Sequence, residues 1–199
     1  MHHSDDSSAD TRTRLIQAAR EAFMREGYRA SMDGIAARAG VAKQTLYNHF
    51  PSKDELFSET ASLSAAAIAI TLDGKTTNVR ASLLRFATTF RERVLGDEGL
   101  ATFRALLSEA SRFPALTQAF FAKGPEQTAG RLADFLDRAM ADGRLRQDDP
   151  RFAAEMLLGM LGGVEHVRRL CKAPAPNIAE KTRIEQIIDC FLRAYAPQH

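Results

Sequence analysis

Apolar residues recur along this chain at intervals of three and four residues, the spacing that places them on one face of an α-helix. Between residues 11 and 26, for example, one face would carry Leu15, Ile16, Ala19, Ala22 and Phe23. No segment shows the alternation of apolar and polar residues that is typical of a half-buried β-strand. The pattern therefore predicts an all-α protein.

Helix start and stop residues divide this pattern into separate helices. Gly27 and Gly40 are typical helix ends, Pro51 cannot continue a helix, and Ser31 and Ser52 are suited to cap helix N-termini. A break is expected at residues 124–125, and the Asp-Pro pair at 149–150 is a typical start. The predicted helices cover residues 11–26, a short segment between 31 and 40, 43–50, 53 to about 72, 78–95, 98–113, a short segment from 114, 126–141, about 150–171, and 178–195.

The chain is expected to have three parts. Residues 1–9 carry Asp5 and Asp6 and lack the apolar segment of a signal peptide, so we expect a disordered tail there. A first domain of short helices is expected at residues 10–57. The longer helices of residues 58–199 would form a second domain.

The composition excludes several classes of protein. Hydrophobic residues make up 45% and charged residues 26%, as in an ordinary globular protein. The longest apolar run, residues 65–72, is much shorter than the ~20 residues of a membrane-spanning helix, so no membrane partner is expected. Cys171 and Cys190 form no metal-binding motif, which favours free thiols and a cytoplasmic location. We expect no metal and no cofactor.

Residues 35–57, IAARAGVAKQTLYNHFPSKDELF, have the dimensions of a helix-turn-helix. Their apolar residues would share a small core with Phe23, which leaves polar side chains on the outer face of the second helix. On that face, Lys43 suits guanine O6 and N7, and the amides of Gln44 and Asn48 suit adenine N6 and N7. The net charge of +2 does not by itself indicate a nucleic-acid partner, but residues 28–53 carry four basic residues against the single acid Asp33.

The segment that contains these helices resembles the DNA-binding domain of the TetR family of transcriptional regulators. The resemblance covers residues 12–57 and runs through Ala18-Ala19, Ala22-Phe23, Gly27-Tyr28, Ile35-Ala36, Ala39-Gly40-Val41, Thr45-Leu46-Tyr47, His49-Phe50, Ser52-Lys53 and Glu55-Leu56. Gln44 and Ala42 depart from the residues common in the family, so no operator sequence can be carried over. The remaining chain is similar to the AefR-like type of TetR regulatory domain. The resemblance implies a three-helix DNA-binding domain followed by a helical bundle for ligand binding and dimerisation.

The resemblance also implies a role for individual residues of the second helix. Lys43, Gln44 and Asn48 would face base edges, and Thr45, Tyr47, His49 and Lys53 would hold phosphates. Three of these assignments have a structural alternative. Tyr47 could pack against Leu46 and Phe50, His49 could be an ordinary surface residue at a helix end, and Lys53 could be a solvated lysine.

A ligand pocket in the second domain would need an apolar lining. The residues expected to supply it are Phe86, Phe90, Phe103, Leu107, Glu109, Phe113, Phe120, Phe121, Phe135, Met156 and Met160. Aromatic and methionine residues at helical spacing are also typical of an ordinary core. Glu109 could anchor a cationic or hydroxylated ligand, or it could pair with Arg104 or Arg112.

A homodimer is expected from the small residues near position 160, since glycine inside a helix costs ~1 kcal/mol relative to alanine and suggests close approach of another backbone. The predicted interface contains Gly159, Gly162, Gly163, His166, Ile184, Ile187, Ile188 and Phe191. Packing of the same surfaces within one chain is the alternative.

No catalytic motif of the common hydrolase, metalloprotease or nucleotide-binding types occurs in the sequence, so we do not expect an enzyme. The sequence favours a cytoplasmic, ligand-responsive regulator. As the resemblance implies, it would bind a palindromic DNA operator as a homodimer, act as a repressor, and be released by a small, largely apolar effector. The alternative is a helical small-molecule-binding or adaptor protein that does not bind DNA.

Overall fold

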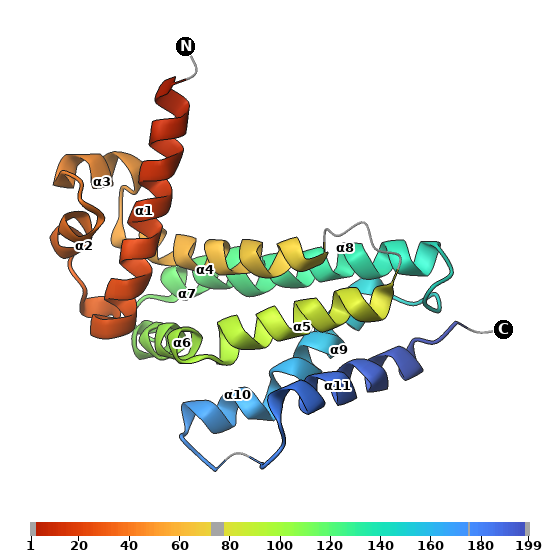
Figure 1. Cartoon of the computed structure of the whole chain (residues 1–199). Helices are drawn as coiled ribbons and strands as arrows, with labels where there is room; N and C mark the ends of the chain where they lie inside the picture. The colour runs from red at the N-terminus through yellow and green to blue at the C-terminus, as the bar shows by residue number, and fades with distance from the viewer. Residues whose placement is uncertain (1–2, 73–77, 175, 198–199) are drawn as a thin grey trace. The chain divides into compact units, whose positions relative to one another are not determined.

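Every regular element in the described residues is a helix, which confirms the all-α prediction. The computed structural model describes residues 3–72, 78–174 and 176–197 (Figure 1). The α-helices are α1 (His3–Glu26), α2 (Met32–Ala39), α3 (Lys43–His49), α4 (Lys53–Ala69), α5 (Val79–Leu95), α6 (Asp97–Glu109), α7 (Pro114–Phe121), α8 (Gln127–Ala141), α9 (Pro150–Leu161), α10 (Gly163–Leu170) and α11 (Glu180–Ala194). Two 3-10 helices, η1 (Gly27–Arg29) and η2 (Ile70–Leu72), and the π-helix η3 (Ala122–Glu126) complete the described elements. None of the described helices is long and apolar enough to cross a membrane.

The helix α1 is longer than the sequence suggested. It begins at His3, so residues 3–9, which were expected to form a disordered tail, have a helical backbone. Neither glycine nor proline occurs between His3 and Asp10, and nothing in the local sequence therefore stops the helix from extending toward the N-terminus. Its predicted apolar face is confirmed, since Leu15, Ala19 and Phe23 are buried.

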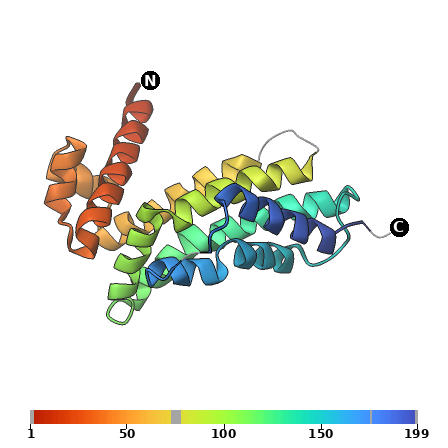
Figure 2. The ribbon, with the colours of Figure 1, turned by 60° about the horizontal axis from the view of Figure 1, so that its bottom comes forward.

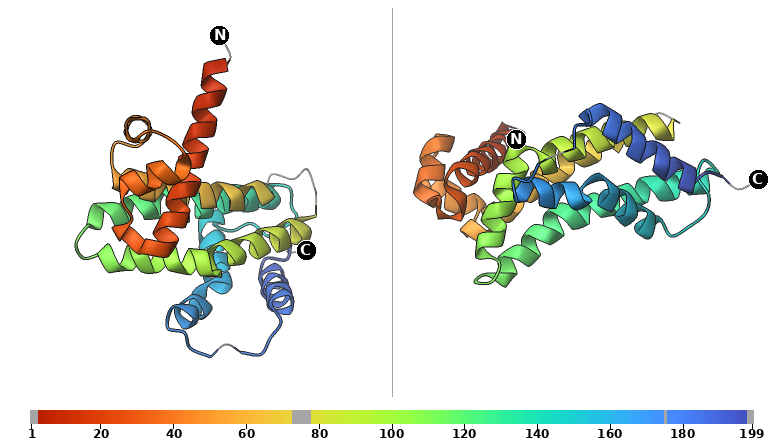
Figure 3. Two further views of the ribbon diagram at one scale, coloured as in Figure 1. Left: turned by 60° about the vertical axis from the view of Figure 1, so that its left-hand side comes forward. Right: turned by 90° about the horizontal axis from the view of Figure 1, so that it is seen from below.

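The chain divides into two compact units. Unit 1 comprises Met1–Ser64 and Ala101–Pro125, and unit 2 comprises Ala65–Leu100 and Glu126–His199. This division differs from the expected boundary after residue 57, because apolar residues of α6 and α7 belong to the same core as those of α1 and α4. Within unit 1, α1 lies beside α2, and α2 beside α3 (Figure 3).

The core of unit 1 is built around aromatic rings. Phe23 of α1 and Phe57 of α4 meet edge to face with their ring centroids 4.9 Å apart. Leu106 of α6 and Leu116 of α7 are buried in the same cluster. Edge-to-face pairs of this kind stabilise beyond their buried area, so α4, α6 and α7 help to hold α1 in place.

The core of unit 2 lies among α5, α8, α9 and α11. The helix α11 packs along α5, and α8 packs along α9 (Figure 2). Phe86, Leu136, Leu157 and Ile188, one from each of these helices, are fully enclosed at the centre. Asp149 begins α9 as predicted, because its carboxylate accepts the backbone N–H of Arg151 at 2.8 Å.

The predicted single helix from about 150 to 171 is wrong. The chain instead forms α9 and α10, with a break at Gly162 and a positive φ of 32° at Gly163. The break exposes the Leu161 carbonyl, which accepts a hydrogen bond from Nη1 of Arg91 at 2.5 Å. Arg91 is itself buried and pairs with Glu180 of α11. A side chain from α5 thus satisfies the free end of α9.

The expected break at residues 124–125 is also wrong. The chain stays helical there and passes through η3 directly into α8. Gly124 makes this possible, because a Cβ at its position would lie 2.9 Å from the Cβ of Ala61 in α4. Close packing of η3 on α4 within unit 1 therefore holds a segment in which Pro125 alone would favour an end to the helix.

Candidate nucleic-acid interface

The turn between α2 and α3 is defined by local hydrogen bonds. Ser31 caps α2, its hydroxyl accepting the backbone N–H of Gly34 at 3.0 Å. Gly40 ends the helix in the left-handed region, with φ of 67°, and the N–H of Val41 donates to the Ala36 carbonyl at 3.0 Å. This arrangement is a Schellman cap, which reverses the chain within three residues. The predicted helix-turn-helix is present.

The inner face of α3 is anchored in the core of unit 1. Leu46 and Phe50 are fully buried, together with Ile35 of α2 and Phe23 of α1, as predicted. Because these positions fix the rotation of α3, its remaining side chains must lie on the outer face. Burial therefore distinguishes the residues of α3 that anchor it in the core from the exposed residues that are free to contact a partner.

The predicted contact residues of α3 occupy that outer face. Lys43, Gln44 and Asn48 are exposed, and Tyr47 is 38% exposed, which does not support the alternative of complete packing against Leu46 and Phe50. The other two predicted contact residues of α3, Thr45 and His49, are half-buried at the edges of the face. A contiguous set of ammonium, amide and hydroxyl groups is therefore available on one side of a short helix.

Two of these side chains are paired within the chain. The Lys43 ammonium lies 2.8 Å from the Asp33 carboxylate of α2, and this hydrogen bond raises the pKa of the lysine. The Gln44 amide donates to Oδ1 of Asn48 at 3.0 Å. Both pairs are exposed to solvent, so a partner with better hydrogen-bonding groups can replace them at small cost. The sequence showed Asp33 as the single acid of the basic segment, but not that it pairs with Lys43.

Lys53 occupies the start of α4. Ser52 caps this helix, its hydroxyl accepting the Glu55 N–H at 3.1 Å. The Lys53 ammonium lies 4.4 Å from the centre of the Tyr28 ring, and partial burial lowers the pKa of the lysine. Burial and a hydrogen bond donated to Asp54 raise the pKa of Tyr28. Lys53 is thus held in position by a cation–π contact beside a helix N-terminus, where an anion is favoured.

The residues predicted to line a ligand pocket are divided between the two units. Phe103, Leu107, Glu109, Phe113, Phe120 and Phe121 belong to unit 1, and Phe86, Phe90, Phe135, Met156 and Met160 belong to unit 2. Several are poor lining residues for opposite reasons. Phe86 and Phe135 are buried in the core of unit 2, whereas Leu107 and Phe121 are more than half exposed.

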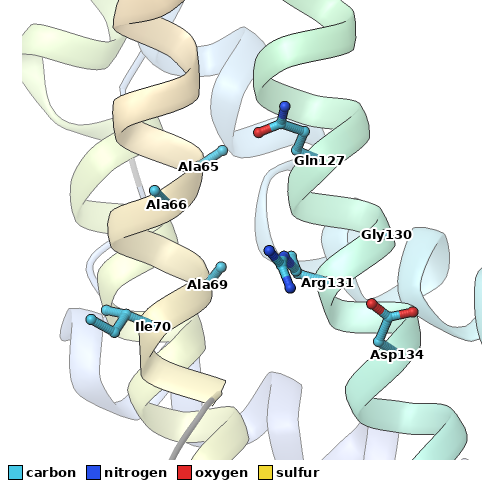
Figure 4. Close-up of a pocket in the computed structure, with 8 residues that line it drawn as sticks. All are labelled: Ala65, Ala66, Ala69, Ile70, Gln127, Gly130, Arg131 and Asp134. Atoms are coloured by element: carbon cyan, nitrogen blue, oxygen red, sulfur yellow. The ribbon is translucent and has the colours of Figure 1, made fainter.

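A groove that the sequence did not predict lies between α4 and α8 within unit 2. Its volume is about 590 Å³, and its lining residues are Ala65, Ala66, Ala69, Ile70, Gln127, Gly130, Arg131 and Asp134. We refer to it as the α4–α8 groove. Gln127 and Arg131 extend from α8 toward the alanines of α4 (Figure 4). The sequence indicated the spacing of Gln127 and Arg131 along one helix, but not that the alanines of α4 lie opposite them.

The predicted dimer interface is only partly available. Ile184, Ile188 and Phe191 of α11 lie in the hydrophobic core of unit 2, so their assignment to an interface is wrong. Ile187 packs against the same core, and His166 is half-buried, where burial lowers its pKa. Gly159 and Gly163 are exposed, and a Cβ on either would meet nothing within 4 Å.

The fold and the polar face of α3 define the chain as a helix-turn-helix protein. Residues 15–60 match the model of the bacterial regulatory proteins of the tetR family. Residues 81–197 match the model of the C-terminal domain of AefR-like transcriptional repressors. The chain belongs to the TetR family of transcriptional regulators and carries an AefR-like C-terminal domain.

Individual relatives agree with this assignment. The HTH-type transcriptional activator FasR of Mycolicibacterium smegmatis is 53% identical over 49 residues, which cover 24% of this chain and 22% of FasR. The regulator Mb1581 of Mycobacterium bovis is 33% identical over 105 residues, which cover 52% of this chain and 50% of that protein. The chain therefore spans at most half the length of these curated relatives.

Solved structures match over almost the whole chain. The flavonoid-responsive regulator FrrA is 31% identical with a TM-score of 0.70, covering 96% of this chain and all of its own. SmeT, solved as a complex with triclosan, is 26% identical with a TM-score of 0.69, covering 95% of this chain and 93% of that one. A TetR family regulator from Pseudomonas syringae pv. tomato is 26% identical with a TM-score of 0.64, covering 98% and 99%.

Proposed function

We propose that this regulator binds a palindromic DNA operator as a homodimer, represses transcription there, and is released by a small, largely apolar effector. The observation that carries the proposal is the exposed polar face of α3, whose opposite side is anchored by Leu46 and Phe50. A helical ligand-binding or adaptor protein has no need of such a face. Membership of this family supports a cytoplasmic location for the regulator.

In the complex, α3 would enter the major groove with Lys43, Gln44 and Asn48 toward base edges. Lys43 would exchange its bond to Asp33 for a guanine, and the Gln44–Asn48 pair would open to reach adenines. Four residues at the ends and edges of this face would hold phosphates: Thr45, Tyr47, His49 and Lys53. The phosphate contacts position the protein, and the base contacts choose the sequence.

A two-fold dimer is supported by an exposed apolar surface on α9 and α10. Phe152 and Met156 of α9 are 55% and 37% exposed, and Val164 and Val167 of α10 are 72% and 59% exposed. Gly159 lies between the two pairs at helical spacing and is also exposed. Large apolar side chains in a row are unfavourable in water, and a second copy of the same surface would cover them. Binding to a palindrome requires the two α3 helices of such a dimer to reach half-sites about 34–36 Å apart.

Release by an effector requires that ligand and operator favour different conformations of the same protein. One structural relative, FrrA, is a flavonoid-responsive regulator, and another, SmeT, was solved as a complex with triclosan. The helix α4 begins at Lys53, a proposed phosphate contact, and its last turns line the α4–α8 groove. A ligand in that groove that prefers one position of α4 would therefore alter operator affinity, and the operator would alter ligand affinity by the same factor.

Selection of DNA sequences by the purified protein tests the proposal. We expect enrichment of a palindrome, followed by a steep loss of affinity between two salt concentrations, since phosphate contacts release counterions. Lys53→Ala should weaken binding to all sequences and lower the salt slope by about one unit, whereas Gln44→Ala should cost about 1–3 kcal/mol on the selected site only. A folded dimer that enriches no sequence would contradict the proposal and favour the ligand-binding alternative.

The dimer has its own test. Val164→Asp and Val167→Asp place a charge on side chains that make little contact with their own chain, so each variant should fold and yet be monomeric when its mass is measured in solution. Arg138→Asp, on an exposed position of α8, is the control for the added charge. A dimer that persists in both valine variants would show that α9 and α10 are not the interface.

A further inference from the structure

The two walls of the α4–α8 groove have opposite chemistry. The α4 side presents the methyl groups of Ala65 and Ala69 toward α8, whereas Ala66 and the exposed Ile70 line the groove from the side of α4 that faces away from α8 (Figure 4). The α8 side presents an amide, a guanidinium and a carboxylate, from Gln127, Arg131 and Asp134. A molecule that lies in this groove meets an apolar surface on one side and hydrogen-bonding groups on the other, which is the environment of an amphipathic ligand.

The polar side chains of the groove are not used by the fold. In the described part of the chain, neither Arg131 nor Asp134 forms an ion pair, and Gln127 forms no side-chain hydrogen bond. Elsewhere in unit 2 the arginines that support the fold are paired, as Arg91 is with Glu180 and Arg151 with Glu126. Arg131 therefore offers an unused guanidinium, whose planar fork of N–H groups matches a carboxylate.

The floor of the groove is open because of a glycine. Gly130 lies between Gln127 and Arg131 on α8, and a Cβ at its position would meet nothing within 4 Å. No neighbouring atom of the fold requires a glycine there, although glycine inside a helix costs stability.

We propose that the α4–α8 groove binds a small amphipathic monocarboxylate, with the carboxylate on Arg131 and the apolar part against Ala65 and Ala69. The volume of about 590 Å³ suits a molecule of one or two fused rings or a medium-length chain. Asp134, one turn beyond Arg131, disfavours a second negative charge and accepts a hydrogen bond from a ligand hydroxyl. Gln127 donates its amide to the same carboxylate or to a ring substituent.

This site deepens the proposed function, because it names the class of effector, but its binding can be measured without DNA. The probes are naphthalene carboxylate and its uncharged analogue naphthalene carboxamide, which have the same apolar part. We expect calorimetric titration of the full chain to show about tenfold tighter binding of the carboxylate, the difference that a charge-assisted hydrogen bond of moderate exposure supplies. A naphthalene dicarboxylate should bind more weakly than the monocarboxylate.

Three variants locate the site. Arg131→Gln should remove the preference for the carboxylate and leave the carboxamide affinity unchanged, whereas Gly130→Met should fill the groove and weaken both probes. Arg138→Gln, a neutralised exposed arginine on the same helix, is the matched control and should change neither affinity. Circular dichroism of each variant confirms that the helices are intact.

The proposal is overturned if the carboxylate does not bind at millimolar concentration, if Arg131→Gln leaves its advantage intact, or if Gly130→Met binds both probes normally. Operator binding is measured separately, with the DNA obtained by selection. Carboxylate binding without any selected DNA would leave the groove assignment standing and contradict the regulator proposal. Selection of a DNA sequence without carboxylate binding would support the regulator proposal and overturn the groove assignment.

Discussion

The end of α9 depends on one buried arginine, and its removal should be costly. Arg91 of α5 is 2% exposed. Its Nε and Nη2 donate to the two carboxylate oxygens of Glu180 at 2.6 and 3.1 Å, and its Nη1 donates to the Leu161 carbonyl at 2.5 Å. The same three helices, α5, α9 and α11, are therefore joined through a single side chain. We expect Arg91→Ala to destabilise unit 2.

The magnitude follows from what each bond loses. Glu180 is half exposed, and it keeps Arg169 at 3.5 Å and regains water when Arg91 is removed, so the Arg91–Glu180 pair contributes little to the loss. The Leu161 carbonyl is left without its charged donor, and the aliphatic part of Arg91 leaves a cavity among α5, α9 and α11. Together these effects predict a loss of about 3 kcal/mol in the free energy of unfolding, or a fall in melting temperature of about 6–12 °C for a chain of this size.

Arg80 provides a matched control on the same pair of helices. It also joins α5 to α11, donating to the two carboxylate oxygens of Asp189 at 2.7 and 3.1 Å, but both side chains are more than 40% exposed. Thermal unfolding of Arg91→Ala, Arg91→Met and Arg80→Ala at one protein concentration tests the reasoning. We expect a large loss in both Arg91 variants, smaller in Arg91→Met, which keeps most of the side-chain volume, and almost none in Arg80→Ala. Equal losses at the two positions would refute the argument that burial sets the cost.

Three other predictions concern unit 1 and the glycines. Burial alone would raise the pKa of Glu59, but hydrogen bonds from Lys123 and Arg12 lower it overall, so its contribution to stability is lost as pH falls through the lowered value. Chemical denaturation across the range below pH 4.5 should show a shallower acid loss in Glu59→Gln than in the parent, and an unchanged slope would contradict this. Asp33→Asn should free Lys43 and raise affinity for DNA of any sequence, as measured by fluorescence anisotropy, whereas equal affinities would show that the pair does not compete with DNA. Gly99→Ala should lower the melting temperature because its Cβ would lie 2.7 Å from the Val94 carbonyl oxygen. Gly130→Ala should stabilise α8 by about 0.5–1 kcal/mol, since a Cβ there meets nothing within 4 Å. A higher melting temperature for Gly99→Ala than for Gly130→Ala would refute the packing argument.

The helix-turn-helix could be predicted almost completely from the sequence. Ser31 and Gly40 act on backbone groups within a few residues of themselves, so their effects can be predicted from the local sequence. The outer face of α3 follows from the helical period, because burial of Leu46 and Phe50 fixes the positions that remain outside. The break between α9 and α10 escaped prediction because its stabilising residue, Arg91, lies far away in the chain.

The sequence by itself determined the helical class, most helix boundaries and the identity of the residues on the outer face of α3. These properties depend on propensity, caps and periodicity, which are interactions between neighbours in the chain. Only the tertiary structure decided that Ile184 and Phe191 belong to the core and that Lys43 pairs with Asp33. It alone brought Arg131 opposite the alanines of α4 to form a groove. Such contacts join residues that are distant in sequence, and they exist only once packing of the apolar faces has fixed where each helix lies.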